Sequence, residues 1–214
     1  MNTLLLQTAY LAPIAYYAVM AQADEVVIEQ YDSYHKQTLR NRCFIGAESG
    51  RMALNIPVVR TGSKQLVKDV RISYQSNWQH QHWQALKSAY NLTPFFEYYA
   101  DDLLPYYQRQ TEFLIDFNIG LQETVMDLLD IHTEVRRSTD YCPADAAQVS
   151  DEEKKTTDLR DHFHAKHEAP RPMPPYWQVF QHRNGFLPDL SIVDLLFNLG
   201  PESSVYLMQK NMTD

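Results

Sequence analysis

Residues 3–29, TLLLQTAYLAPIAYYAVMAQADEVVIE, decide the fold class of this chain. The run from Thr3 to Thr8 is largely apolar, which is typical of a strand that is buried on both faces of a sheet. Pro13 suits the first turn of a helix, where its missing N–H has no partner to lose, and the helix is expected to run to about Gln22. Glu25–Glu29 has the composition of a second strand. A strand, a helix and a strand of these lengths predict two parallel strands joined by a helical crossover.

The same N-terminal stretch is apolar enough to be compared with a secretory signal or a membrane anchor. A secretory signal begins with positive charge, but the first Lys or Arg of this chain is Lys36. A membrane span needs roughly 20 predominantly apolar residues, and Gln7 and Pro13 interrupt this run. Cys43 and Cys142 allow one disulfide in a secreted chain, although two reduced thiols in a cytosolic chain are favoured. We therefore expect a cytoplasmic protein with no membrane span.

The rest of the chain adds a hairpin, several helices and a polar segment. Turn-forming residues at 48–50 separate two strand-like runs, and Pro57 places the second run near a sheet edge. Apolar periodicity predicts strands at 70–73 and 133–138, and helices at 78–90, 95–107, 112–131 and 190–198.

The segment 138–175 differs from its surroundings in composition. It is polar, lacks periodicity and has four prolines between residues 170 and 175, which is typical of a surface loop or flap. We expect one α/β domain over residues 1–214, with a mostly parallel central sheet, flanking helices, a β-hairpin insertion and a C-terminal helical segment.

A cluster of cations stands out in a chain whose formal net charge is −8. The acidic balance argues against a general nucleic-acid binder, which needs a basic face, but a local cluster can still bind a small anion. The cluster comprises Lys36, Arg40, Asn41 and Arg42. Strand alternation would turn Arg40 and Arg42 to one face, where they could hold an anionic substrate. The alternatives are a solvated loop, or an arginine paired with an acid such as Asp24 or Asp32.

Polar residues near the end of the first predicted strand form a second candidate site. In open α/β sheets, ligands bind outside the carboxyl ends of the strands. Gln7 lies at that end, and Tyr10 and Tyr17 follow it, so all three are candidates for substrate binding. The alternative places Gln7 in a core hydrogen bond and both tyrosines in core packing.

Three histidines in one short segment raise the possibility of a metal site. His162, His164 and His167 do not match a common zinc-ligand spacing, and we expect no metal there. The chain has no GxGxxG, GxSxG or HExxH motif. The sequence therefore identifies no cofactor and no catalytic residue, and it leaves the oligomeric state open.

Several segments together resemble the WbqC-like family over nearly the whole chain, in the version found in Bacteroides-type bacteria. They are residues 7–17, 24–29, 34–42, 69–74, 90–96, 176–180 and 190–198. Gln178, in the segment YWQVF, joins the candidate substrate-binding residues. The segment His164-Ala165-Lys166 departs from the His-Pro-Lys expected there.

This resemblance implies a bacterial role in making or decorating activated sugars for O-antigen-type surface polysaccharides. We accordingly expect a transferase that acts on an anionic small molecule, such as a nucleotide sugar or an acyl or aminoacyl donor. The alternative is a non-catalytic binding or accessory protein of polysaccharide assembly.

Overall fold

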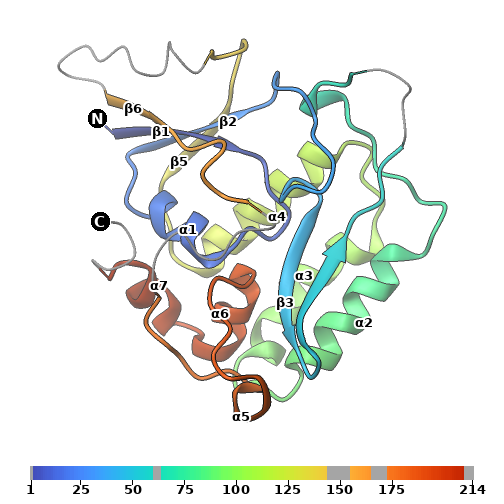
Figure 1. Cartoon of the computed structure of the whole chain (residues 1–214), viewed down its shortest axis with the longest axis vertical. Helices are drawn as coiled ribbons and strands as arrows, with labels where there is room; N and C mark the ends of the chain where they lie inside the picture. Colours follow the sequence, from blue (N-terminus) through green and yellow to red (C-terminus); the bar gives the residue numbers. More distant parts are fainter. Residues whose placement is uncertain (1, 60–63, 144–154, 165–172, 210–214) are drawn as a thin grey trace.

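The computed structural model describes residues 2–59, 64–143, 155–164 and 173–209. Its centre is a four-stranded sheet in the order β5-β2-β1-β6, seen at the top of Figure 1. The strands are β1 (Asn2–Gln7), β2 (Glu25–Glu29), β5 (Glu134–Arg137) and β6 (Lys155–Asp158). Every neighbouring pair is parallel. The predicted α/β class and the parallel central sheet are therefore confirmed.

Side-chain alternation buries both faces of β1, as its apolar run predicts. Leu4 and Leu6 belong to the main hydrophobic core, whereas Leu5 packs with Val27 on the opposite face. Helix α1 (Ile14–Met20) joins β1 to β2 and contributes to the main core. Pro13 occupies its N-cap with an extended backbone. This is the predicted strand–helix–strand unit.

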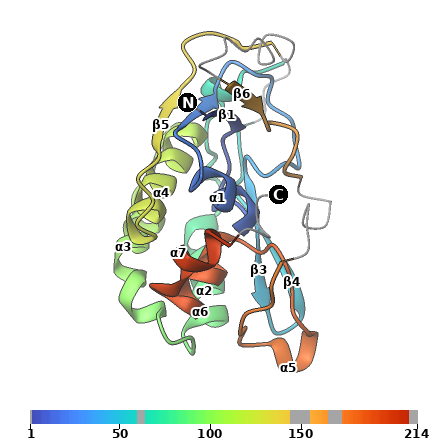
Figure 2. The same cartoon turned by 90° about the vertical axis from the view of Figure 1, so that its left-hand side faces the viewer.

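A hairpin and helices separate β2 from β5 along the chain. Strands β3 (Arg42–Ala47) and β4 (Gly50–Asn55) form the predicted antiparallel hairpin. The helical elements that follow are η1 (Val67–Asp69), α2 (Trp78–Tyr90), α3 (Phe96–Gln108) and α4 (Leu114–Leu128). In Figures 1 and 2, α1 and α4 lie below the sheet, and the hairpin runs beside α2.

The C-terminal part of the described chain is helical, as predicted. It contains α5 (Gln181–Asn184), α6 (Ile192–Leu199) and α7 (Glu202–Leu207). Helix α6 packs against α1, α3 and β3, so it connects the sheet layer with the hairpin and the helical layer. Gly200 ends α6 with a positive φ of 55°, a conformation that favours glycine.

Two segments differ from the predictions. Residues 70–73 form isolated bridges to Val58 and Phe113 rather than a strand. Strand β6 lies inside the segment 138–175 that composition assigns to a polar loop. Its sequence, KTTD, is too short and polar to signal a strand alone, and pairing with β1 creates it. Residues 144–154 and 165–172 of that segment lie outside the described ranges.

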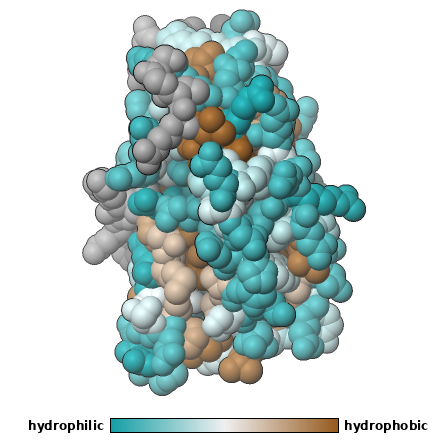
Figure 3. Space-filling model, turned by 90° about the vertical axis from the view of Figure 1, so that its right-hand side faces the viewer, coloured by the Kyte–Doolittle hydropathy of each residue, from teal (hydrophilic) through white to brown (hydrophobic). Residues whose placement is uncertain are grey.

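The surface on the hairpin side is mainly hydrophilic. Figure 3 shows apolar residues on this face only in small, separate patches, which is usual for protein surfaces. Among the residues described, no helix combines the length and the apolar character needed to cross a membrane.

Candidate functional site

A cavity of about 260 Å³ lies at the carboxyl ends of β1 and β6. The chain continues from β1 to its neighbour β2 on one side, whereas β6 is added later on the other side. The point between β1 and β6 is therefore a topological switch point, where ligands of open α/β sheets bind. The cavity wall comes from the loop after β1, the hairpin, the loop after β6 and the segment before α6: Leu11, Pro13, Leu39, Cys43, Phe44, Arg51, His162, Phe163, His164, Asp189 and Ser191.

One cation and one carboxylate belong to this wall. The guanidinium carbon of Arg51 lies 4.1 Å from the centre of the Phe44 ring, a cation–π contact. Asp189 is buried and accepts a hydrogen bond of 2.9 Å from the backbone N–H of Ala15, in the first turn of α1. Burial raises the pKa of Asp189 to about 6, although the Ala15 N–H and the charge of Arg51 oppose that shift. The cavity therefore has charges of both signs on its wall.

The loop after β6 brings two imidazoles to the cavity, and Gln7 holds that loop. His162 and His164 line the cavity on either side of Phe163 in the chain. Gln7 Nε2 donates a hydrogen bond of 2.9 Å to the carbonyl oxygen of Phe163. The side chain of Gln7 is itself buried, so this bond satisfies a polar group at the end of β1. Gln7 thus fixes the backbone of the loop whose residues 162–164 line the cavity.

Ser191 adds a hydroxyl without a hydrogen-bond partner. The pattern Ser191-Ile-Val-Asp194 fits a capping box at the start of α6. Ser191 does occupy the N-cap, but its side chain makes no capping bond. Its Oγ is buried without a partner among the described residues, and Ser191 lines the cavity. Buried hydroxyls usually have a partner, so this one is available to a bound molecule.

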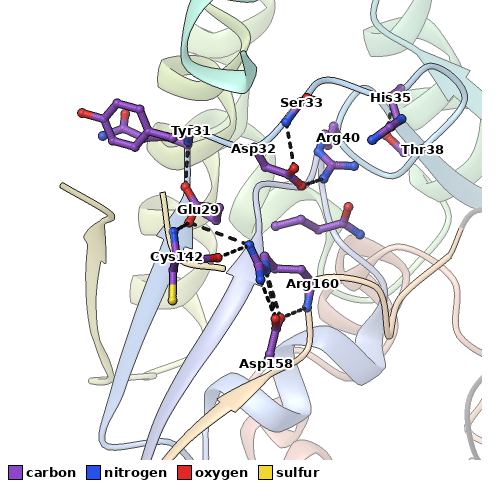
Figure 4. Close-up of polar contacts among 12 residues, drawn as sticks. Glu29, Tyr31, Asp32, Ser33, His35, Thr38, Arg40, Cys142, Asp158 and Arg160 are labelled. Atoms are coloured by element: carbon purple, nitrogen blue, oxygen red, sulfur yellow. Dashed lines mark hydrogen bonds and ion pairs between the residues drawn. The ribbon is translucent and has the colours of Figure 1, made fainter. Parts of the chain in front are cut away.

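The predicted cation Arg40 belongs to a separate polar cluster, shown in Figure 4. Its Nη2 lies 3.1 Å from an oxygen of Asp32, which is the pairing that the alternative interpretation names. Nearby, Arg160 makes several hydrogen bonds to Asp158 and lies 3.9 Å from the buried carboxylate of Glu29. These contacts tie the ends of β2 and β6 together. Burial lowers the pKa of Arg40, and Asp32 partly offsets this effect.

The other residues of the predicted cation cluster have different surroundings. Lys36 is exposed. Arg42 Nε donates to the side-chain oxygen of Asn55, and Asn41 donates a bond of 2.8 Å to the carbonyl of Ile56. None of the three predicted cations appears in the described wall of the cavity. Their role in anion binding stays a prediction.

Tyr10 and Tyr17 lie in the hydrophobic core. The Tyr10 hydroxyl lies 3.0 Å from His82 Nδ1 and 2.9 Å from the Tyr107 hydroxyl. Burial lowers the pKa of His82 to about 4. Tyr17 is almost fully buried, and burial raises the pKa of its hydroxyl. These are the surroundings expected if both tyrosines serve core packing.

Gln178 supports a buried carboxylate next to the hairpin. Its Nε2 lies 3.0 Å from Asp194 Oδ2, and the other Asp194 oxygen accepts a bond of 2.8 Å from Tyr90. Tyr176 donates to the same carboxylate. Burial raises the pKa of Asp194, and these hydrogen bonds lower it. Gln178 therefore contributes to a structural network rather than to the described cavity wall.

The sequence did not identify Arg51, Asp189 or Ser191 as site residues. Arg51 is a single cation at a hairpin turn, and only the hairpin's packing on the sheet loops brings it to the cavity. Asp189 and Ser191 lie at the start of the helix predicted from residue 190, and Asp and Ser are typical residues at a helix N-terminus. This position is the one sequence feature that could have marked the two residues as candidates.

A metal centre is not formed by the residues that the structure describes. No group of three or more His, Cys, Asp or Glu side chains in those ranges is arranged to hold a metal ion. His167, one of the three histidines considered from the sequence, lies outside the described ranges.

Comparison with known proteins places the chain in a family. The uncharacterized protein Rv1507c of Mycobacterium tuberculosis is 28% identical over 222 residues, which cover 95% of this chain and 96% of that protein. No solved structure matches the chain. The model of the WbqC-like protein family matches residues 7–169. That match spans most of the sequence, and the chain belongs to the WbqC-like protein family.

Proposed function

We propose that this protein is a cytoplasmic enzyme of surface-polysaccharide precursor biosynthesis. In this proposal it is a transferase that acts on an anionic small molecule, such as a nucleotide sugar or an acyl or aminoacyl donor. The observation that carries the proposal is the cavity at the switch point, whose wall combines apolar side chains with one arginine, one carboxylate, two imidazoles and one hydroxyl. A few convergent polar groups in an apolar cavity are typical of small-molecule sites. Two cysteines without a disulfide support the cytoplasmic location.

Arg51 is the proposed anchor for the anion. Its guanidinium has no acidic partner within 4.0 Å among the described residues and lies over the ring of Phe44. A charge-assisted hydrogen bond to a phosphate or carboxylate contributes about 1.5–3 kcal/mol.

His162 and His164 are the proposed acid and base. A transfer reaction removes a proton from the acceptor and supplies one to the leaving group, and imidazole can do both near neutral pH. Gln7 acts as a positioning residue, because its bond to the Phe163 carbonyl fixes the backbone between the two histidines. A test of this role is the pH profile of the reaction, which His164→Gln should change.

The size of the cavity limits which part of the donor it holds. Its volume of about 260 Å³ is below the roughly 300–1,000 Å³ of typical ligand pockets. One end of a nucleotide sugar would therefore enter the cavity, and the remainder would lie outside. We keep Lys36 and Arg42 as proposed contacts for that outer part, and the buried Arg40 as a proposed source of positive charge near it.

Ligand-dependent thermal unfolding tests the proposal. A panel of nucleotide sugars and acyl donors is screened, and a true ligand at 100 times its Kd stabilises the fold by about 2.7 kcal/mol. Arg51→Ala should weaken binding of that ligand at least about tenfold, since 1.4 kcal/mol equals one factor of ten. The matched control is Arg71→Ala, because Arg71 also lies over a ring, that of Phe113, but is outside the cavity wall.

Equal losses in the two arginine variants would contradict the proposed site. Binding without any transfer to sugar or amine acceptors would instead support the alternative of a binding or accessory protein.

A further inference from the structure

The two charges on the cavity wall do not neutralise each other by direct contact. Within the described ranges, the ion pairs closer than 4.0 Å include neither Arg51 nor Asp189. The two are nevertheless close enough for each to influence the ionisation of the other. Asp189 is 8% exposed, and its Oδ1 accepts a hydrogen bond from the backbone N–H of Ala15. A buried carboxylate in this position needs a further donor or cation to offset its desolvation.

Ser191 gives an independent indication of a missing partner. It is two residues from Asp189 in the chain, lines the same cavity and is 2% exposed. Its Oγ has no partner in the described part of the molecule. A buried polar group without a partner destabilises a fold, so a ligand that hydrogen-bonds to it gains affinity. The unpaired hydroxyl and the two charged side chains line one cavity.

We propose that the cavity selects a ligand with an anionic group and a primary amine, of the class of amino-sugar phosphates. In this arrangement the phosphate contacts Arg51, the ammonium group contacts Asp189, and a ring hydroxyl or oxygen bonds to Ser191. The inference rests on the proposed function for the location of the site, and it narrows the substrate class.

Charge explains why the amine matters. A ligand with only negative charge would meet Asp189 at close range, where like charges repel. A neutral sugar hydroxyl would bring no positive charge into contact with the buried carboxylate of Asp189. An ammonium group removes both penalties. The apolar wall around it, from Leu11, Pro13 and Phe163, strengthens the interaction because it excludes water.

Three sugar phosphates that differ at one position provide the test. They are glucosamine 1-phosphate, N-acetylglucosamine 1-phosphate and glucose 1-phosphate, which carry an amine, an amide and a hydroxyl on the same ring. Calorimetric titration of the wild-type protein at pH 7.5 should give the amine at least about tenfold tighter binding than either of the others. This comparison uses the wild-type chain, so it does not depend on the folding of any variant.

Substitutions then test which residues cause the preference for the amine-bearing ligand. Asp189→Asn should remove the preference for the amine, because asparagine keeps an oxygen for the Ala15 N–H but has no charge. Ser191→Ala should weaken the binding of all three ligands several-fold without changing the order of their affinities. The control is Asp101→Asn, an exposed carboxylate on α3 outside the cavity wall, which should change nothing.

The outcomes separate this inference from the proposed function. Equal affinity for the three ligands, with binding still lost in Arg51→Ala, overturns the amine preference and leaves the anion site intact. A preference that survives in Asp189→Asn also overturns it. If none of the three binds at millimolar concentration, the inference fails, whereas stabilisation by a nucleotide sugar that depends on Arg51 would still support the proposed function.

Discussion

Asp189 combines an uncommon backbone conformation with a role at the site. Its φ is 50°, a region in which Asp and Asn are tolerated better than most residues. Its carboxylate caps α1 through Ala15 and lines the cavity through its remaining surface. Asp189 therefore both caps the start of α1 and supplies the carboxylate of the cavity wall.

The raised pKa of Asp189 predicts a specific pH dependence of stability. Burial raises this pKa from 3.8 to about 6, so the folded protein holds the proton more tightly than the unfolded chain does. The contribution of Asp189 to stability is therefore full below about pH 4 and is lost as pH rises through 6. At about 1.4 kcal/mol per pKa unit the loss is roughly 3 kcal/mol.

The Asp189→Asn variant should not show this loss of stability as the pH rises. Urea unfolding of both proteins at pH 4, 5, 6 and 7 gives the difference in free energy, in which the other titrating groups largely cancel. The wild-type protein should lose stability relative to the variant across this range. A difference that does not change with pH would show that Asp189 titrates normally.

The sequence correctly located Gln7 at the end of β1, where it is buried and donates a hydrogen bond to the Phe163 carbonyl. A role for Gln7 in substrate binding stays a prediction. Arg40 has the right charge for an anion site, but Asp32 is its partner, and sequence spacing alone cannot show which acid the folded loop brings near. Arg51 gave no signal because a lone arginine in a hairpin is usually a solvated residue.

Strand β1 is an inner strand of the sheet, because it pairs with β2 on one side and β6 on the other. Leu5→Asp should abolish folding, since Leu5 is 2% exposed and the new carboxylate would lie unpaired in the sheet layer. Circular dichroism of the soluble fraction measures the outcome. Met52→Asp on β4 is the control: Met52 is 38% exposed, so its replacement should change stability by about 0.5 kcal/mol or less. A folded Leu5→Asp protein would contradict the sheet assignment.

Elements with a strong local pattern were predictable, and those that depend on distant pairing were not. The boundaries of β2 and α2 agree with the apolar runs in the sequence. Strand β6 has only four residues with mostly polar side chains, and its pairing partner β1 lies about 150 residues earlier in the chain. Residues 70–73 have strand-like composition but form only single bridges among the described residues, to Val58 and Phe113.

For the whole molecule we predict a single cooperative unfolding transition. The main core joins residues of the sheet, the hairpin and both groups of helices, so no part of it can open without exposing the rest. Trp78 is buried in this core, and its fluorescence reports on tertiary packing. Urea curves from tryptophan fluorescence and from far-ultraviolet circular dichroism should coincide. Separate midpoints would instead indicate two independently stable parts and would contradict the single domain proposed for residues 1–214.

The pairing of β1 with β6 also has a consequence for synthesis on the ribosome. β1 is made first, but the strand that completes its second edge follows about 150 residues later. At roughly 5–20 residues per second, the nascent chain carries that open edge for about 8–30 seconds. An apolar strand with unpaired N–H and C=O groups is a template for wrong pairing between chains. The need for chaperone protection should therefore be greatest before residues 155–158 emerge, and it should persist in any truncated product that ends ahead of them.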